Sequence, residues 1–160
     1  MVDFGIYNAI WALWHLGMPA QVFAVTHQFQ PERFPKVEDN AVMVLTYPDS
    51  VGVFESSWAL PRGSRSLEVS GSDGSFSLSR DSLAYRERRG EARELEASPL
   101  PEADRNPIRH VIDRLSRGRP PGHITAIDIN VDAVQVLEAA KLSARQGRAI
   151  SLPLPVPAAD

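Results

Sequence analysis

The sequence has 160 residues, a net charge of −3 and 43% hydrophobic residues, which is typical of one globular domain with its own core. The slight excess of acidic residues argues against nucleic-acid binding, because nucleic-acid binders usually carry a basic patch that neutralises phosphates. The chain has no cysteine, so it forms no disulfide and offers no thiolate. We expect a cytoplasmic protein, and a leader peptide lost before the N-terminus stays an open alternative.

The apolar run from Phe4 to Val25 raises the question of a membrane span. A spanning helix needs about 20 consecutive apolar residues. This run is interrupted by polar or helix-breaking residues at Asn8, His15, Gly17, Pro19 and Gln21. We therefore expect no membrane span here.

The first element is predicted to be a helix from Asp3 to Leu16, because Gly17 and Pro19 form a stop signal directly after it. At about 100° per residue, one face of this helix is apolar and should enter the core. That face consists of Ile6, Ala9, Ile10, Leu13 and Leu16. The neighbouring face carries an acid, a phenol and two indoles: Asp3, Tyr7, Trp11 and Trp14.

Strand patterns follow this helix. Residues 21–29 are rich in β-branched and aromatic residues, which strands prefer. Residues 40–61 indicate a hairpin with its turn at 48–50, and residues 66–97 indicate a meander with turns at 71–75, 80–82 and 89–90. Strands joined by tight turns pair antiparallel, so about six antiparallel strands are expected in one sheet.

A second helix is predicted to begin at a cap formed by Asp104 or Asn106 and to end at Gly118. Its apolar residues have the spacing of a face that enters the core. They are Ile108, Val111, Ile112 and Leu115.

A third helix is predicted to follow a capping box of Thr125 and Asp128 and to end at Gly147. Its last turns are rich in small residues, which allow a neighbouring element to lie close: Ala139, Ala140, Ser143 and Ala144. A final strand over 148–154 precedes a proline-rich tail, residues 154–160.

The order of these elements indicates an α+β fold, in which an open, mainly antiparallel sheet has helices packed on one face. The hairpin is apolar on both sides, with Val42 and Val44 on one and Met43 and Leu45 on the other. Helices cover only one of these sides. The other face is therefore available for dimerisation or for a second domain.

Most candidate sites in the sequence are weak. No metal is expected, because the histidines lack the spacing of metal ligands and no cysteine accompanies them. They are His15, His27, His110 and His123. The glycine-containing turn at 71–75 lies between short strands, so it is not a phosphate-binding loop. Asp3 and Tyr7 remain, four residues apart on one helix face.

Two interpretations of this pair stay open. In the simpler one, Asp3 caps the helix and Tyr7 packs its ring. In the other, the pair is catalytic. Free tyrosine has a pKa of about 10 and is a poor base at neutral pH without a nearby cation. Neither lysine of the chain, Lys36 or Lys141, is an obvious candidate, so a catalytic Tyr7 takes its cation from elsewhere.

Four segments, in this order, resemble the C-terminal domain of the Gfo/Idh/MocA oxidoreductases. They are DFGIYNAIWALWHLG, VEDNAVMVLTYPDSVGVFESSW, LEVSGSDGSFSL and VLEAAKLSARQGRAISLPL. The resemblance covers nearly the whole chain and implies such a domain over residues 1–153, followed by the tail. Position 7 is more often histidine in this family. Tyrosine is found in the glucose–fructose oxidoreductase and dihydrodiol dehydrogenase branches.

The resemblance implies a function as well as a fold. In this family an N-terminal Rossmann domain binds NAD or NADP, and that domain is missing from this sequence, which has no G-x-G-x-x-G. Asp3 would hold a substrate hydroxyl and Tyr7 would transfer the proton, while hydride passes between a sugar, polyol or related alcohol and nicotinamide. The isolated chain would be inactive, and it would self-associate through its sheet.

Two alternatives belong to other functional classes. The chain could be a non-catalytic module that dimerises through its sheet, with Asp3 and Tyr7 as relics of a site. It could also be an independent carbohydrate-binding domain, which a half-site makes a poor explanation.

Overall fold

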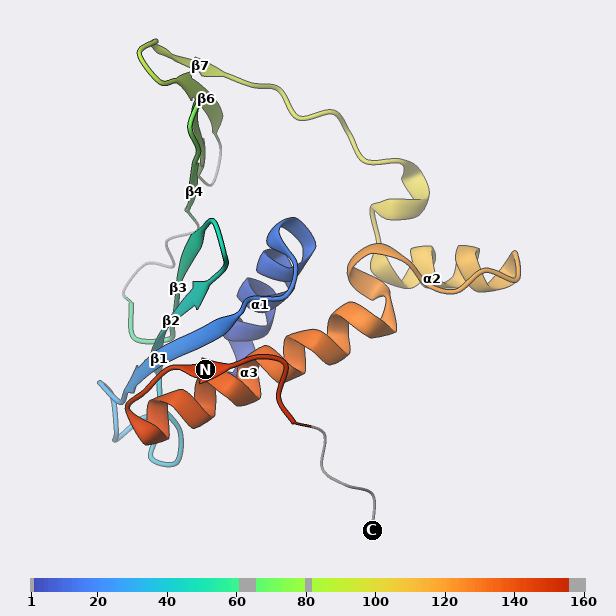
Figure 1. Cartoon of the computed structure of the whole chain (residues 1–160). Helices are drawn as coiled ribbons and strands as arrows, with labels where there is room; N and C mark the ends of the chain where they lie inside the picture. The colour runs from blue at the N-terminus through green and yellow to red at the C-terminus, as the bar shows by residue number, and fades with distance from the viewer. Residues whose placement is uncertain (1, 61–65, 80–81, 156–160) are drawn as a thin grey trace. The chain divides into compact units, whose positions relative to one another are not determined.

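The computed structural model describes residues 2–60, 66–79 and 82–155. It confirms the α+β class (Figure 1). The elements are α1 (Val2–Leu16), β1 (Gln21–His27), β2 (Asn40–Thr46), β3 (Val51–Ser57), β4 (Leu67–Ser70), β5 (Gly74–Leu78), β6 (Leu83–Glu87), β7 (Ala92–Glu94), α2 (Pro107–Ser116), α3 (Ile127–Gln146) and β8 (Ile150–Ser151), with short 3-10 turns at Glu102–Asp104 and His123–Thr125. Two compact units result: unit 1 is Met1–Ala59 with Asn106–Asp160, and unit 2 is Leu60–Arg105.

The strands form two four-stranded sheets, ordered β3-β2-β1-β8 and β4-β5-β6-β7, where one sheet was expected. Every adjacent pair of strands is antiparallel, as predicted. The two sheets are separated between β3 and β4. The connection between these strands, residues 58–66, is longer than a hairpin turn, so β3 and β4 need not pair with each other. The turn predicted at 80–82 lies partly outside the described residues, and the Ser79 N–H donates to the Ser82 carbonyl at 2.9 Å.

In unit 1, α1 and α3 pack on one face of the β3-β2-β1-β8 sheet (Figure 1). Burial alternates along β1 and β2 accordingly. The side chains that face the helices form the core together with small residues of α1 and α3. The buried apolar cluster is Ala9, Ala12, Val22, Ala24, Met43, Leu45, Ala133, Val136, Leu137, Ala139, Ala140 and Ile150.

Helix α1 ends as predicted. Gly17 has φ +78, the left-handed conformation that commonly ends a helix and that glycine adopts without strain. Its predicted core face is correct for Ala9, and Ile6, Ile10 and Leu13 pack against the core. Leu16 was expected in the core and is 40% exposed, whereas Ala12 is fully buried. Leu16 shares a stripe of α1 with the buried Gly5, Ala9 and Ala12, but it is the last residue of the helix, where the chain turns away at Gly17.

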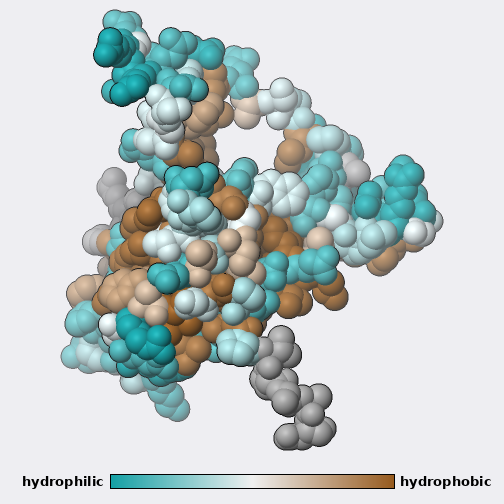
Figure 2. Space-filling model, viewed as in Figure 1, coloured by the Kyte–Doolittle hydropathy of each residue, from teal (hydrophilic) through white to brown (hydrophobic). Residues whose placement is uncertain are grey.

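Helix α2 begins at Asn106, whose side-chain oxygen accepts the N–H groups of Ile108 and Arg109. Its apolar face was expected in the core, and this prediction is wrong for three of four residues. Ile108, Ile112 and Leu115 are exposed at 69%, 61% and 59%. The physical reason is that α2 lies beyond the N-terminal end of α3, away from the sheet (Figure 1). Hydrophobic residues accordingly reach the surface around α2 (Figure 2).

Helix α3 begins after Ala126, and no side chain caps it, so the capping box predicted at Thr125 and Asp128 is wrong. The Thr125 hydroxyl instead donates to the Gly122 carbonyl at 2.6 Å, within the preceding 3-10 turn. The C-terminal end is as predicted, with Gly147 at φ +64. No helix among the described residues is long and apolar enough to cross a membrane.

Ser143 on α3 is fully buried and links three parts of unit 1. Its hydroxyl oxygen accepts the N–H of Ala24 at 2.9 Å and donates to the carbonyl of Arg148 at 2.6 Å. Strand β8 pairs with β1 only at Gln21 and Val22. Ser143 therefore supplies the acceptor that a longer β8 would otherwise offer to Ala24.

Unit 2 is a meander whose registers place apolar side chains opposite one another. One cross-strand row is Val69, Phe76 and Tyr85, and the next is Leu67, Leu78 and Leu83. The rings of Phe76 and Tyr85 lie 4.8 Å apart. Because side chains alternate along a strand, both rows share one face of this sheet. Within the described part of unit 2, no α-helix covers that face.

Candidate functional site

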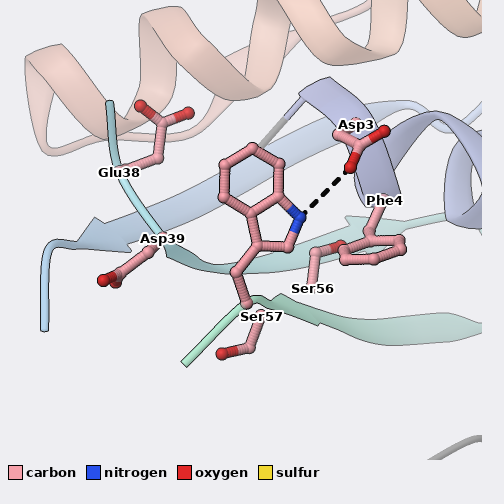
Figure 3. Close-up of a pocket in the computed structure, with 7 residues that line it drawn as sticks. Asp3, Phe4, Glu38, Asp39, Ser56 and Ser57 are labelled. Carbon is pink, nitrogen blue, oxygen red and sulfur yellow. Dashed lines mark hydrogen bonds between the residues drawn. The ribbon is translucent and has the colours of Figure 1, made fainter. Parts of the chain in front are cut away.

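Asp3 lies in the first turn of α1 rather than at the cap position, because the helix already includes Val2. Its carboxylate oxygen Oδ2 accepts the indole N–H of Trp58 at 3.1 Å (Figure 3). Trp58 follows directly after β3. The predicted site residue is thus bound to a side chain 55 positions away.

A hollow lies beside this pair. It is lined by Asp3, Phe4, Glu38, Asp39, Ser56, Ser57 and Trp58 (Figure 3). These residues come from the start of α1, from the segment before β2 and from the end of β3. The β2–β3 register pairs Asn40 with Ser57 and so brings Asp39 and Trp58 together.

Asp39 organises the segment between β1 and β2. It is only 3% exposed, and its two carboxylate oxygens accept the N–H groups of Phe29 at 2.8 Å and Gln30 at 2.7 Å. Its backbone carbonyl also accepts the N–H of Trp58 at 2.7 Å. These contacts give Asp39 a structural role, and both of its side-chain oxygens already have partners.

Asn8 fixes α1 to β3 next to the hollow. Its side-chain amide donates to the carbonyl of Glu55 at 3.2 Å and to the hydroxyl of Ser56 at 3.0 Å. These two hydrogen bonds hold the start of α1 on β3, beside the hollow.

Tyr7 lies one turn after Asp3 on the same face of α1, because residues four apart are neighbours on a helix. It is 67% exposed, so its ring is not packed in the core of this chain as the simpler interpretation held. Among the described residues its hydroxyl makes no hydrogen bond, and Tyr7 is not part of the hollow's lining. The structure brings Asp3 to Trp58 and leaves Tyr7 open beside them.

The hollow is acidic. Burial acts to raise the pKa of the Glu38 carboxyl, but hydrogen bonding and nearby positive charge, including that of Lys141, outweigh it and lower the pKa. Glu38 is thus charged at neutral pH, and it lines the hollow together with Asp3. Such a surface favours the hydroxyl donors of a neutral ligand and disfavours the pyrophosphate of a dinucleotide, which binds to N–H groups and positive charge. The hollow does not fit the phosphates of NAD or NADP.

No group of three or more His, Asp or Glu side chains among the described residues could hold a metal ion. The histidines predicted to be ordinary polar residues include one close pair. The rings of His110 and His123 lie 5.3 Å apart, and that of His123 also lies 5.3 Å from Trp14. This contact connects α2 to α1 through the 3-10 turn at His123–Thr125.

The sequence interpretation gave no role to Asp39 and did not predict that Trp58 contacts Asp3. A usable signal exists, because Asp39 directly precedes β2 and Trp58 directly follows β3. The ends of a two-stranded hairpin lie next to each other, so residues at these positions become neighbours. That Trp58 also reaches Asp3 depends on how α1 packs, which the hairpin alone does not specify.

Comparisons with known proteins identify families and solved structures that this chain resembles. Residues 1–77 match the family model described as GFO/IDH/MocA C-terminal domain. A search of the curated proteins gives no match. Among solved structures, an oxidoreductase from Agrobacterium radiobacter in complex with NAD+, L-tartaric acid and magnesium has 25% identity and a TM-score of 0.73, covering 93% of this chain and 48% of its own.

Two further solved structures have the same fold. An aldose-aldose oxidoreductase from Caulobacter crescentus, complexed with glycerol, has 25% identity and a TM-score of 0.78, covering 92% of this chain and 46% of its own. A levoglucosan dehydrogenase in its apo form has 14% identity and a TM-score of 0.76, covering 96% of this chain and 51% of its own. The chain spans about half the length of these structures. The resemblance that the motifs predict is confirmed: residues 1–77 match the GFO/IDH/MocA C-terminal domain model, and the fold matches oxidoreductase structures over more than 90% of this chain.

Proposed function

We propose that this chain is the substrate-side domain of an oxidoreductase that acts on a sugar, polyol or related alcohol in the cytoplasm, with NAD or NADP bound by another domain. The observation that carries the proposal is the Asp3–Trp58 pair beside an exposed Tyr7 on the first two turns of α1. This arrangement presents a carboxylate acceptor and a phenol on one surface. An alcohol substrate needs both an acceptor for its hydroxyl and a group that exchanges its proton.

In this proposal Asp3 accepts a substrate hydroxyl and Tyr7 exchanges the proton of the alcohol that is oxidised. Tyr7 needs a cation to titrate usefully. Lys141 is engaged by Glu138 at 2.6 Å on α3. We therefore assign the cation to the domain that binds the nucleotide. The isolated chain is expected to be inactive, because it has neither this cation nor a nucleotide site.

The solved structures support the class of substrate. One is an aldose-aldose oxidoreductase complexed with glycerol and another is a levoglucosan dehydrogenase, so proteins of this fold act on sugars. The complex with NAD+ supports a nicotinamide cofactor. The acidic hollow, which suits neutral hydroxyl groups better than phosphates, agrees with a cofactor held mainly elsewhere.

Replacing Asp3 by Asn in the holoenzyme tests the proposal. We expect kcat/KM for the alcohol substrate to fall about 10- to 100-fold, since a hydrogen bond to a charged group contributes about 1.5–3 kcal/mol. Steady-state kinetics with NAD+ and with NADP+ measure kcat/KM for the variant and the wild type. Asp49→Asn, in the turn between β2 and β3, is the matched control and should leave kcat/KM within two-fold. Equal kinetics for both variants would contradict the proposed role of Asp3.

A second candidate function, assembly through the open sheet face, is favoured by a different observation. The face of β1, β2 and β3 turned away from α1 and α3 carries the cross-strand row Phe23, Val44 and Val53. Val53 is 68% exposed and Val25, two residues beyond Phe23, is 56% exposed. A contiguous apolar face of this kind commonly marks an interface. We propose that it pairs with the same face of a second copy, whether or not the site is catalytic.

The assembly proposal predicts that Val53→Lys weakens self-association. A lysine in the middle of an apolar interface lacks a partner, so the dissociation constant should rise about 10-fold or more. Sedimentation velocity over a concentration series measures this effect. Val134→Lys on α3, which replaces another exposed valine, should leave the dissociation constant unchanged. A wild-type chain that stays monomeric at micromolar concentration would exclude a stable interface.

A further inference from the structure

Trp58 is held from several directions. Its backbone N–H donates to the Asp39 carbonyl at 2.7 Å. The ring of Phe4 meets it edge-on at 6.4 Å between centroids, and the ring of Phe34 lies against it at 5.0 Å. Its indole N–H is then directed to Asp3. A side chain fixed by its backbone and by two rings presents its donor in one direction.

The segment between β1 and β2 supports the ring of Phe34. The Gln28 side-chain amide donates to the carbonyls of Phe34 and Val37, the latter at 3.1 Å. The Asp39 carboxylate accepts the two N–H groups at Phe29 and Gln30, as described above. These contacts close residues 28–39 into a compact loop. The loop places Phe34 on Trp58, and Trp58 on Asp3.

The hydrogen bond between Trp58 and Asp3 adds little to the attachment of α1. Asn8 already fixes that helix to β3 by two hydrogen bonds, and the apolar residues of α1 pack against the core. Trp58 is 37% exposed and Asp3 lies at the surface, where water competes for the hydrogen bond and lowers its net contribution to stability. The bond occupies Oδ2 of Asp3, and among the described residues nothing bonds to Oδ1.

We propose that Trp58 is a positioning residue, which orients the Asp3 carboxylate so that Oδ1 faces the substrate hydroxyl. The inference rests on the proposed function, because it gives Asp3 a substrate to hold. The loop of residues 28–39 helps to orient Trp58, because it holds the ring of Phe34 against the indole. A carboxylate with one oxygen fixed loses less conformational entropy when the substrate binds. The Asp3–Trp58 hydrogen bond is therefore expected to affect substrate affinity more than the free energy of unfolding.

The first test observes the contact in the chain itself. The protein has three tryptophans, so a ¹⁵N-labelled sample gives three indole N–H resonances. The resonance of Trp58 is identified by its loss in Trp58→Phe. We expect Asp3→Asn to move this resonance more than those of Trp11 and Trp14. Equal or smaller movement of the Trp58 resonance overturns the inference.

The second test measures kinetics in the holoenzyme. Trp58→Phe keeps an aromatic ring between Phe4 and Phe34 but removes the donor. We expect kcat/KM to fall about ten-fold, mainly through a higher KM, because the bond to a charged group is lost. Trp14→Phe, which also removes an indole from the surface, should change kcat/KM less than two-fold. The double variant with Asp3→Asn should be no worse than Asp3→Asn alone, since both remove one interaction.

The outcomes separate this inference from the proposed function. If Asp3→Asn lowers kcat/KM and Trp58→Phe does not, the positioning role is wrong and the proposed function stands. Independent, additive losses from the two variants also overturn it. If neither Asp3→Asn nor Tyr7→Phe changes turnover, the proposed function fails and the positioning role fails with it. A drop in melting temperature with unchanged KM would show that Trp58 acts only on stability.

Discussion

Tyr7→Phe is expected to lower kcat of the holoenzyme about 10²- to 10⁴-fold, which is the range that a positioned general acid or base contributes. The substitution removes one hydroxyl from a side chain that is 67% exposed, so it costs the fold almost nothing. Stopped-flow measurement of NAD(P)H formation separates the chemical step from product release. The oligomeric state, measured on the same sample, should be unchanged.

Tyr85→Phe is the matched control for this prediction. Its ring lies against Phe76 in unit 2, and it should leave kcat within two-fold. Full turnover in Tyr7→Phe would contradict a catalytic role and would favour the assembly function of the sheet. A loss of turnover with an intact oligomer would support the catalytic function and leave assembly as a separate property of the same chain.

Ser143→Ala is expected to lower the free energy of unfolding by about 2–4 kcal/mol. It removes one hydroxyl that serves two backbone groups, the N–H of Ala24 and the carbonyl of Arg148. A buried polar group that loses its partner costs about 1–3 kcal/mol, and both groups lose theirs together. Urea denaturation followed by circular dichroism measures the change.

Ser116→Ala controls for the loss of a hydroxyl as such. The Ser116 hydroxyl also donates to a backbone carbonyl, that of Asp113 at 2.9 Å, but at an exposed position of α2. Its replacement should change the free energy of unfolding by no more than about 0.5 kcal/mol. If Ser143→Ala were equally mild, a rearranged backbone or a water molecule would be satisfying Ala24, and Ser143 would not be the residue that completes the edge of β1.

Local signals predicted much of the fold. Helices α1 and α3 end at Gly17 and Gly147, which have positive φ, and a glycine at a helix end can be recognised in the sequence alone. The turn at 48–50 between two apolar runs predicted the hairpin of β2 and β3. The cap at Asn106 was one of two alternatives, and the structure selects it. In each case the determining interaction lies within a few residues of chain.

Long-range packing decided what the sequence pattern missed. The spacing of Ile108, Ile112 and Leu115 is that of a core face, yet spacing does not tell whether another element covers it. Leu16 was predicted in the core by helical angle alone, yet it is the last residue of α1 and is 40% exposed, while Ala12, one turn earlier on the same stripe, is buried. Such outcomes depend on which elements meet.

The candidate site shows the same division. Asp3 and Tyr7 are neighbours by helical spacing, which the sequence contains. The contact of Asp3 with Trp58 requires the docking of α1 on β3, which no local pattern contains. The roles of Asp3 and Tyr7 stay predictions, as does the division at residue 153, and residues 156–160 of the predicted tail lie outside the described part of the chain.

Unit 1 is discontinuous in sequence, and this affects how the protein folds during synthesis. The core residues of α1 and β1 pack against α3, and the hydrogen bond from Ala24 to Ser143 spans 119 positions. A ribosome therefore completes unit 2 before α3 exists to cover Val22 and Met43. Contacts of such large sequence separation slow folding, and apolar strands that wait for their cover are exposed to aggregation. The nascent chain should depend on chaperones until residues 133–143 have emerged.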